Sequence, residues 1–491
     1  MLRQFKGIAI LVIGRGMQIL AALATIKIAT SLMSPGQIGS VNQVTSLAVL
    51  LSSTFIAPVS TYLGRGLVGW RESGTLTIYL GRYLEFVTMS SVILASAMWL
   101  AEGMANFVPA VSSPWLFLLV LAYLMFFSIH TAATSGLVIL ERRTAYIVFT
   151  NIAPWAGLFL AVILLYQYAQ PEVWLLGIFG GFLLSSTAIF VLLSSSRGNR
   201  GQAVSDSPRP VIPFTVRSVF LFAFPQAIVY VLWWVQSQSY RFILDDIAGL
   251  ASVGLFFAAY ALCSMPMTTF ETLFNEYYSP TLYRNLKGEN REQRAEAWNA
   301  YANAYIPAVV LFGMFLIGVG PYLAKILLGE EFQGVGAIIV WPAMTETMRA
   351  VSSSLYTMGI VKVDMRLNIP PVVAGALISP LLVYMLAPQD PLVGTGVALF
   401  AAGLAVLLVV IPISYRALPV KWPWMRIVQA VILGLPMVIA GAVASSSAPV
   451  ILWTDAIVTL IIVVIYLTVA EYLLARKWLS EIHLHTQARQ S

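Results

Sequence analysis

Several long apolar stretches of this sequence contain ionisable residues well inside them. These residues are Arg15 and Lys27 in the first stretch, Arg82 and Glu85, then Glu271, and finally Glu346 with Arg349. An arginine guanidinium presents a planar fork of donors that matches the oxygens of a phosphate. A carboxylate in apolar surroundings is suited to exchange a proton or hold a cation. The pattern therefore indicates anion binding together with ion coupling.

Arg15 is the most informative of these residues. It lies about eight residues, or about 12 Å, into the apolar run "LVIGRGMQILAALATIKIATSL" of residues 11–32, with no carboxylate three or four positions away. Gly14 and Gly16 remove side-chain bulk beside it, which lets another helix or a ligand approach closely. Lys27, near the far end of the same run, is close enough to the interface to extend its ammonium outward. We expect Arg15 to contact an anion.

The other embedded charges have two interpretations each. Arg82 with Glu85, and Glu346 with Arg349, are three positions apart, so each pair can neutralise itself on one helix face or serve a functional site. Arg82 is also close enough to the inner interface to extend into it. Glu271 lies near the inner end of its run. We assign Lys27, Arg82 and Arg349 with Arg15 to substrate binding, and Glu85, Glu271 and Glu346 to ion coupling.

The elements that position these residues must be membrane-spanning helices. Of the 491 residues, 59% are hydrophobic and only 10% are charged. The mean hydropathy is +0.84. Charged residues are too few to cover a water-soluble protein of this size, and apolar runs of about 20 residues recur along the whole chain. The apolar run after "MLRQFK" is too long for a signal-peptide core, so we expect it to remain as the first span.

Fourteen spans are predicted, with both termini cytoplasmic. Their approximate limits are 7–31, 39–63, 77–101, 115–139, 147–168, 173–195, 214–238, 252–276, 299–319, 334–360, 368–387, 391–413, 427–446 and 450–474. This arrangement places 22 of the 28 Lys and Arg residues on the cytoplasmic side and only Arg241 and Lys325 outside, as the positive-inside rule requires. The expected fold is an all-α, polytopic integral membrane protein.

The polar, proline-containing segment 197–213 predicts a division of the chain. We expect an N-terminal lobe of six spans at 1–196, a cytoplasmic linker at 197–213, a C-terminal lobe of six spans at 214–415, two extra spans at 416–474 and a cytoplasmic tail at 475–491.

Other kinds of chemistry find little support in the sequence. There is no glycine-rich phosphate loop ending in Lys-Ser or Lys-Thr, and His130, His483, His485 and the single Cys263 form no ligand pattern, so we expect no cofactor and no metal site. The basic residues are scattered through short loops, which argues against nucleic acid as a partner. The short outer loops leave no room for an external catalytic domain. We therefore expect a transporter rather than an enzyme.

Three stretches resemble a known family: "LMSPGQIG" at 32–39, "RFILDDIAGLASVGLFFAAYAL" at 241–262 and "ILLGEEFQG" at 326–334. They are similar to the polysaccharide-transporter branch, the Wzx-like O-antigen and exopolysaccharide flippases, of the multidrug/oligosaccharidyl-lipid/polysaccharide (MOP) superfamily. The resemblance implies a two-lobed, V-shaped bundle in the bacterial inner membrane. It also implies alternating access and export of a polyprenyl-diphosphate-linked oligosaccharide through a basic central cavity.

The cargo that the resemblance implies is an anion, which the embedded cations would bind. The diphosphate would meet Arg15, Lys27, Arg82 and Arg349, with Arg241 a weaker candidate because Asp245 and Asp246 offer it a local ion pair. Transport would be coupled to a H⁺ or Na⁺ gradient, with membrane lipids and the polysaccharide polymerase machinery as partners.

Two alternatives stay open. One is a cation-coupled multidrug exporter of the same superfamily, although an excess of embedded cations is unfavourable for cationic drugs. The other is a membrane-embedded glycan polymerase or ligase.

Overall fold

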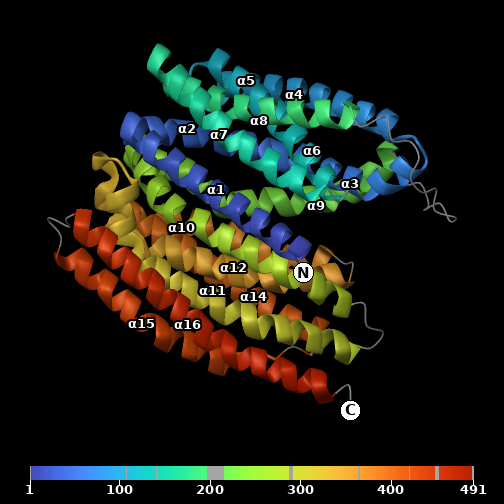
Figure 1. The fold of residues 1–491 in the computed structure, drawn as a ribbon. Coiled ribbons are helices and arrows are strands. Elements are labelled where there is room, and N and C mark those ends of the chain that lie inside the picture. Colours follow the sequence, from blue (N-terminus) through green and yellow to red (C-terminus); the bar gives the residue numbers. More distant parts are fainter. Residues whose placement is uncertain are drawn as a thin grey trace. The chain divides into compact units, whose positions relative to one another are not determined.

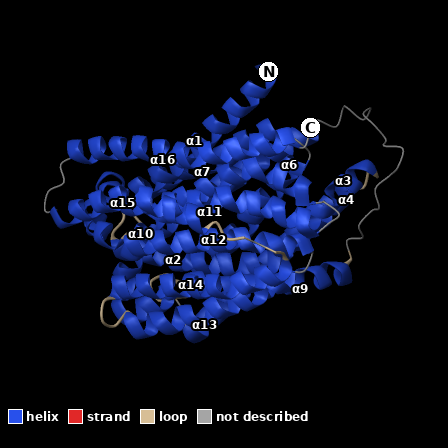
Figure 2. Cartoon of the chain, turned by 90° about the horizontal axis from the view of Figure 1, so that it is seen from below, coloured by secondary structure: helices blue, strands red, loops and turns tan. Residues whose placement is uncertain are grey.

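The protein is helical throughout the part of the chain that the structure describes. The computed structural model describes residues 2–106, 108–139, 142–195, 215–286, 291–362, 365–419, 421–447 and 453–488. Within these ranges every regular element is a helix and none is a strand (Figure 2). The predicted linker at 197–213 lies outside the described residues, as do residues 450–452 at the predicted start of the last span.

Figure 1 shows the helices in chain order, from blue at the N-terminus to red at the C-terminus. In order they are α1 (Leu2–Leu32), α2 (Pro35–Leu51), α3 (Ala57–Glu72), α4 (Leu76–Ala105), α5 (Ser113–Ala122), α6 (Ser128–Ile139), α7 (Arg143–Tyr168), α8 (Pro171–Ser195), α9 (Val216–Gln238), α10 (Tyr240–Leu286), α11 (Arg291–Leu327), α12 (Val340–Lys362), α13 (Ile369–Leu386), α14 (Pro391–Ala417), α15 (Trp424–Ser447) and α16 (Trp453–Ala488). Short 3₁₀ turns, η4 (Glu330–Ile338) and η5 (Met365–Asn368), precede α12 and α13.

The fourteen predicted helices are confirmed. Two of them are interrupted, because α2 continues into α3 through the π-helical turn η1 (Ser52–Ile56), and α5 continues into α6 through η2 (Tyr123–Phe127). A π turn inserts one extra residue into an α-helix without ending it. Helices α10, α11 and α16 extend well beyond the expected limits, and α10 and α11 do so at both ends.

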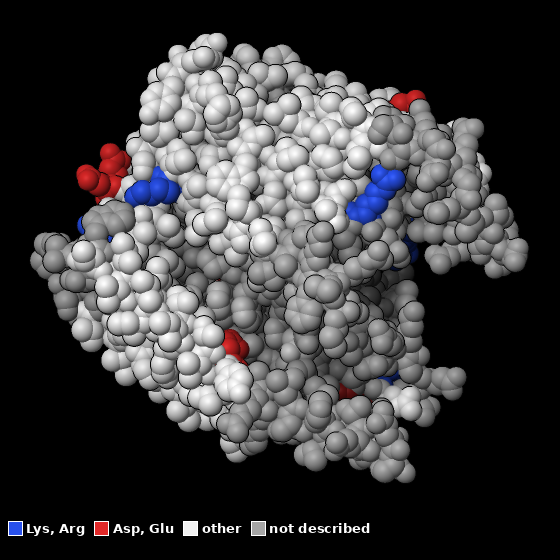
Figure 3. Space-filling view, viewed as in Figure 1, with Lys and Arg blue, Asp and Glu red and all other residues white. Residues whose placement is uncertain are grey.

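The composition of the surface shows why these helices belong in a bilayer. By length and composition, eleven segments of the described residues could cross a membrane, one of them combining α9 with most of α10. Large apolar side chains such as Ile432 and Ile439 on α15 and Ile461 and Ile465 on α16 are more than half exposed. On the face shown in Figure 3, few of the described side chains are charged. The chain is a multi-pass membrane protein.

The described helices form two compact units. Unit 1 comprises residues 1–25 and 36–234, and unit 2 comprises residues 26–35 and 235–491. The boundary between these units falls near the end of α9, and the end of α1 belongs to unit 2. Helices α15 and α16, expected as separate extra spans, both pack against α11 inside unit 2.

Helix α11 is the core of unit 2. It packs against α10, α12, α15 and α16, and Tyr305, Val309 and Val319 along it are fully buried. Helix α10 bends at Gly249, whose φ of 78° lies in the left-handed region that favours glycine. The bend separates a short first part that carries Arg241 from a long second part that carries Glu271.

In unit 1, helices α7 and α8 pack closely against each other. A side chain at Gly177 of α8 would collide with the backbone of Ala161 on α7. Small residues at such positions let two membrane helices approach until their backbones touch. Ser52 and Ser128, at the two π turns, lie 3.5 Å apart between their hydroxyl oxygens.

Candidate functional site

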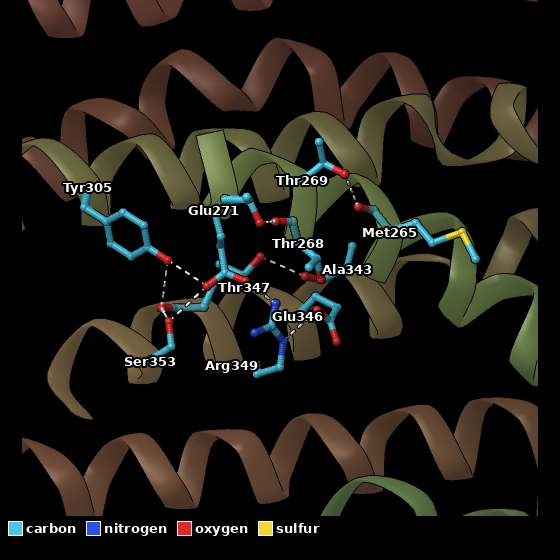
Figure 4. Close-up of polar contacts among 12 residues, drawn as sticks. Met265, Thr268, Thr269, Glu271, Tyr305, Ala343, Glu346, Thr347, Arg349 and Ser353 are labelled. Atoms are coloured by element: carbon cyan, nitrogen blue, oxygen red, sulfur yellow. Dashed lines mark hydrogen bonds and ion pairs between the residues drawn. The ribbon is translucent and has the colours of Figure 1, made fainter. Parts of the chain in front are cut away.

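An arginine of α12 joins two glutamates of unit 2. The Nε of Arg349 donates a hydrogen bond of 2.8 Å to Oε2 of Glu346, one turn earlier on the same helix. Its Nη2 donates to Oε2 of Glu271 on α10 (Figure 4). The pairing of Glu346 with Arg349 that their spacing suggested is therefore present, and it includes a third charged partner that is distant in sequence.

Hydroxyl groups complete the coordination of both carboxylates. Oε1 of Glu271 accepts hydrogen bonds from the Tyr305 hydroxyl on α11 at 2.8 Å and from the Ser353 hydroxyl on α12 at 2.9 Å. Oε1 of Glu346 accepts from the hydroxyl of Tyr260 on α10. Every carboxylate oxygen thus has a donor, which is the condition for keeping charge inside a protein.

The cluster formed by Glu271, Glu346 and Arg349 carries one more carboxylate than cations. The side chains of Glu346 and Glu271 are 2% and 10% exposed, whereas the Arg349 side chain is 33% exposed. A buried excess charge is expensive unless a proton or a cation compensates for it. The cluster can therefore take up one positive charge, and the arginine is its accessible member.

Helix geometry explains how α12 supplies most of this cluster. Glu346, Arg349 and Ser353 are spaced by three and four residues, which places them on one face of an α-helix. Helices α10 and α11 both pack against α12. Helix α10 contributes Glu271 and Tyr260 to the cluster, and α11 contributes Tyr305.

Arg15 lies in unit 1, where α1 meets α7. Its Nη1 donates to Oε1 of Gln18 at 2.7 Å, and its guanidinium carbon is 5.8 Å from the ring centre of Tyr146. The Gln18 amide in turn donates to the Thr150 hydroxyl at 2.7 Å. These contacts fix the orientation of the guanidinium between α1 and α7.

The two glycines that flank Arg15 have different surroundings. A side chain at Gly14 would collide with Ile147 of α7, and the Gly14 carbonyl accepts a hydrogen bond of 3.1 Å from Asn151. No atom lies within 4 Å of where a side chain at Gly16 would begin. Gly14 is therefore the position that lets α7 approach, whereas a side chain at Gly16 would meet no neighbouring helix.

Arg82 and Glu85 of α4 are both exposed, and no ion pair joins them in the described part of unit 1. The Arg82 guanidinium is 5.7 Å from the ring centre of Tyr79 instead. Of the two charges, therefore, neither is paired with the other in the described structure.

Lys27 belongs to unit 2. Its Nζ donates to the carbonyl of Leu328 at 2.9 Å, and Thr30, one turn later, accepts from the Gly329 amide at 2.9 Å. Both sit on a polar cavity of about 700 Å³ that Lys325, Glu330 and Glu331 also line. Lys27 is thus held by a protein carbonyl beside this cavity.

Arg241 is buried, with only 8% of its surface exposed. Its Nε lies 3.4 Å from the hydroxyl of Tyr240, and its guanidinium is 5.7 Å from the ring centre of Phe257. Packing in unit 2 thus encloses this side chain.

The structure brings only some of the candidate residues together. Glu271, Glu346 and Arg349 are in direct contact, so residues assigned to ion coupling and to substrate binding share one cluster. Sequence reasoning missed Tyr260, Tyr305 and Ser353; the spacing of Ser353 from Arg349 was the available signal. Among the described residues, no three His, Cys, Asp or Glu side chains could hold a metal ion.

No protein-family model and no curated protein sequence matches this chain. Solved structures do match it. The lipid II flippase MurJ, in an inward closed conformation, matches 97% of this chain and 100% of its own, with a TM-score of 0.67 and 11% identity. An inward-facing multidrug resistance MATE transporter of the MOP superfamily matches 84% of this chain and 98% of its own, with a TM-score of 0.57 and 11% identity. An outward-facing multidrug resistance MATE transporter matches 82% of this chain and 93% of its own, with a TM-score of 0.53 and 13% identity.

These similarities define the fold. The chain has the fold of the MOP superfamily transporters, and its structural neighbours are a lipid flippase and multidrug transporters. At 11 to 13% identity the likeness concerns the fold and leaves the substrate open.

Proposed function

We propose that this protein is a flippase of the polysaccharide-transporter branch. It moves polyprenyl-diphosphate-linked oligosaccharide from the cytoplasmic to the outer leaflet of the bacterial inner membrane, with both termini cytoplasmic. The observation that carries the proposal is the extent of the structural match: a lipid II flippase accounts for 97% of this chain, whereas the two MATE transporters account for 84% and 82%.

The embedded arginines support an anionic cargo. Arg15 is oriented by Gln18 of α1 and Tyr146 of α7. A guanidinium held in this way binds a diphosphate through charge-assisted hydrogen bonds. Lys27 and Arg82 are further candidates for the same cargo. Polymerase machinery that elongates the exported glycan is the expected partner.

A flipping assay tests the proposal. The purified protein is reconstituted into vesicles containing a polyprenyl-diphosphate oligosaccharide with a fluorescent glycan, and access of a membrane-impermeant quencher reports its leaflet. We expect Arg15→Ala to lose most of the flipping rate and Arg15→Lys to keep part of it, because lysine retains the charge without the fork. Arg217→Ala, at an exposed arginine near the start of α9, is the matched control and should flip normally.

Full flipping by a correctly folded Arg15→Ala protein would remove Arg15 from the cargo site. Failure of the unmodified protein to flip any diphosphate lipid, with vesicles that accumulate cationic drugs instead, would reject the proposed cargo.

The second candidate, a cation-coupled multidrug exporter, is favoured by one observation. The cluster of Glu271, Glu346 and Arg349 has an excess of negative charge, which suits a cationic substrate. Drug susceptibility in a host that lacks its own exporters separates the two functions, because only the exporter should raise resistance.

A further inference from the structure

Five cations lie where the first turns of α11 meet the end of α14 and the start of α15. They are Arg291 and Arg294 of α11, Arg416 of α14, Lys421 of the connection that follows, and Arg426 of α15. All five belong to unit 2, and the predicted orientation places them on the cytoplasmic side. We call these five residues the basic patch.

Hydrogen bonds hold the chain after α14 against α11. The Nη2 of Arg291 donates to the carbonyl of Arg416 at 3.2 Å. The backbone amide of Lys421 donates to Oδ1 of Asn299 at 2.8 Å. The basic patch is therefore formed by contacts between segments that are more than 100 positions apart.

Helix α15 packs against the same side of α11. The Nη1 of Arg426 donates to the carbonyl of Asn303 at 3.4 Å. Asn303 follows Asn299 by four positions, which places the two asparagines on one face of the helix. The first turn of α15 therefore borders the patch.

Two buried donors of this region have no acceptor within the described chain. They are the Nε of Arg294 and the indole Nε1 of Trp422. Buried polar groups in proteins nearly always have a hydrogen-bond partner, because an unsatisfied donor is costly. A phosphate oxygen accepts from both kinds of donor, and its bond to a guanidinium is strengthened by charge. The two donors therefore point to an oxygen-rich ligand.

The charge balance favours an anion. Segments 291–303 and 416–426 together contain the five cations of the patch and only two carboxylates, Glu292 and Glu296. Both glutamates are exposed. The excess of three positive charges attracts a negatively charged group to this end of unit 2.

The surface beside the patch is that of a lipid-facing helix. Trp424 and Met425, in the first turn of α15, are 65% and 72% exposed. The rings of Trp422 and Trp424 are 5.8 Å apart between their centres. Tryptophan is enriched at the level of the lipid headgroups. Cations next to this apolar surface fit a ligand that has both an anionic head and an acyl chain.

We propose that the basic patch binds the headgroup of an anionic phospholipid from the cytoplasmic leaflet. The phosphate accepts hydrogen bonds from Arg294 and Trp422, and the acyl chains lie along the exposed first turns of α15. Basic pockets between membrane helices on the cytoplasmic side bind such headgroups in general. The bound lipid holds α11 and α15 together at the surface of the bilayer. This inference does not depend on which cargo the protein transports.

Thermal unfolding of the purified protein in a neutral detergent tests the proposal. Phosphatidylglycerol, phosphatidylcholine with the same acyl chains, and inorganic phosphate are added separately. We expect phosphatidylglycerol to raise the unfolding midpoint by about 2 °C or more relative to phosphatidylcholine, because a ligand that binds the folded state stabilises it. Inorganic phosphate should have no comparable effect.

Variants locate the site. The double variant Arg294→Gln with Lys421→Gln should lose most of the difference between the two lipids. Arg217→Gln, at an exposed arginine of α9 on the same predicted side, should keep it. If the double variant does not fold, Lys421→Gln alone changes only an exposed side chain and should lose part of the difference.

Trp422→Phe separates lipid binding from a purely structural role. It removes a buried donor that has no acceptor within the described chain. Without added lipid the variant should therefore be at least as stable as the unmodified protein, yet it should gain less from phosphatidylglycerol.

Three outcomes would overturn the proposal. The first is an undiminished difference between the two lipids in the folded double variant, or in Lys421→Gln where only that variant folds. The second is equal stabilisation by inorganic phosphate, which would define a site for free anions. The third is a larger shift with farnesyl diphosphate that the same substitutions abolish, which would make the patch a site for the cargo.

Discussion

Arg349 of α12 and Glu271 of α10 are 78 positions apart in the sequence, and their side chains form an ion pair inside unit 2. Glu346 holds the same guanidinium from the other side at 2.8 Å. A cation placed between two buried carboxylates stabilises both, and each member of the cluster then depends on the others.

This dependence predicts a non-additive effect on stability. Arg349→Met leaves two buried carboxylates without their cation and should cost about 3 kcal/mol of unfolding free energy, the lower end for a broken buried pair because Arg349 is partly exposed. Adding Glu346→Gln to that variant should recover part of the loss. Thermal unfolding in detergent measures both, and strictly additive losses would show that the residues are energetically independent.

The contact between α1 and α7 predicts unequal effects of two neighbouring substitutions. Gly14→Ala places a methyl group against Ile147 and should destabilise the protein by about 1 to 3 kcal/mol. Gly16→Ala meets nothing within 4 Å and should leave the midpoint of thermal unfolding nearly unchanged. Equal midpoints for the two variants would mean that α7 does not approach α1 at Gly14.

The orientation of Arg15 should depend on Gln18. Gln18→Leu removes the acceptor at 2.7 Å from the guanidinium and also the bond to Thr150. A hydrogen bond to a charged group contributes about 1.5 to 3 kcal/mol, so we expect the apparent affinity for a diphosphate lipid to fall about tenfold or more, with normal protein levels. Thr150→Val should have a smaller effect in the same direction. Unchanged affinity in both variants would mean that these contacts do not position Arg15.

Labelling of introduced cysteines tests the orientation in the membrane. Cys263 is buried, so Cys263→Ala provides a background without reactive thiols. In that background, Glu331→Cys should react with a membrane-impermeant maleimide on intact cells, whereas Glu292→Cys should react only after the cells are opened. Both residues are exposed and both belong to unit 2. The reverse pattern would invert the predicted orientation.

The helices could be predicted because each is encoded locally. A run of about 20 apolar residues has essentially one stable structure in a bilayer, since every backbone group must be satisfied within the segment. The extensions of α10 and α11 beyond their apolar runs were not predicted. Polar residues continue these two helices, and the hydropathy pattern ends with the apolar run.

The candidate site could be predicted only in part. Embedded charges such as Glu271 and Arg349 are conspicuous in an apolar sequence because they are costly there. Their neutral partners are less conspicuous: tyrosines such as Tyr260 and Tyr305 are common in membrane helices, and nothing in their spacing shows that they face a carboxylate. The meeting of Glu271 with Arg349 could not be predicted either, because it depends on how α10 packs against α12.

By itself the sequence determined that this chain is a helical membrane protein with costly charges in its spans, because hydropathy and charge act along a single segment. Tertiary packing decided that Lys27 and Arg15, on one helix, belong to different units, and that Arg349 has two carboxylates as neighbours. Such relationships join residues of different helices, and they depend on which helix faces meet.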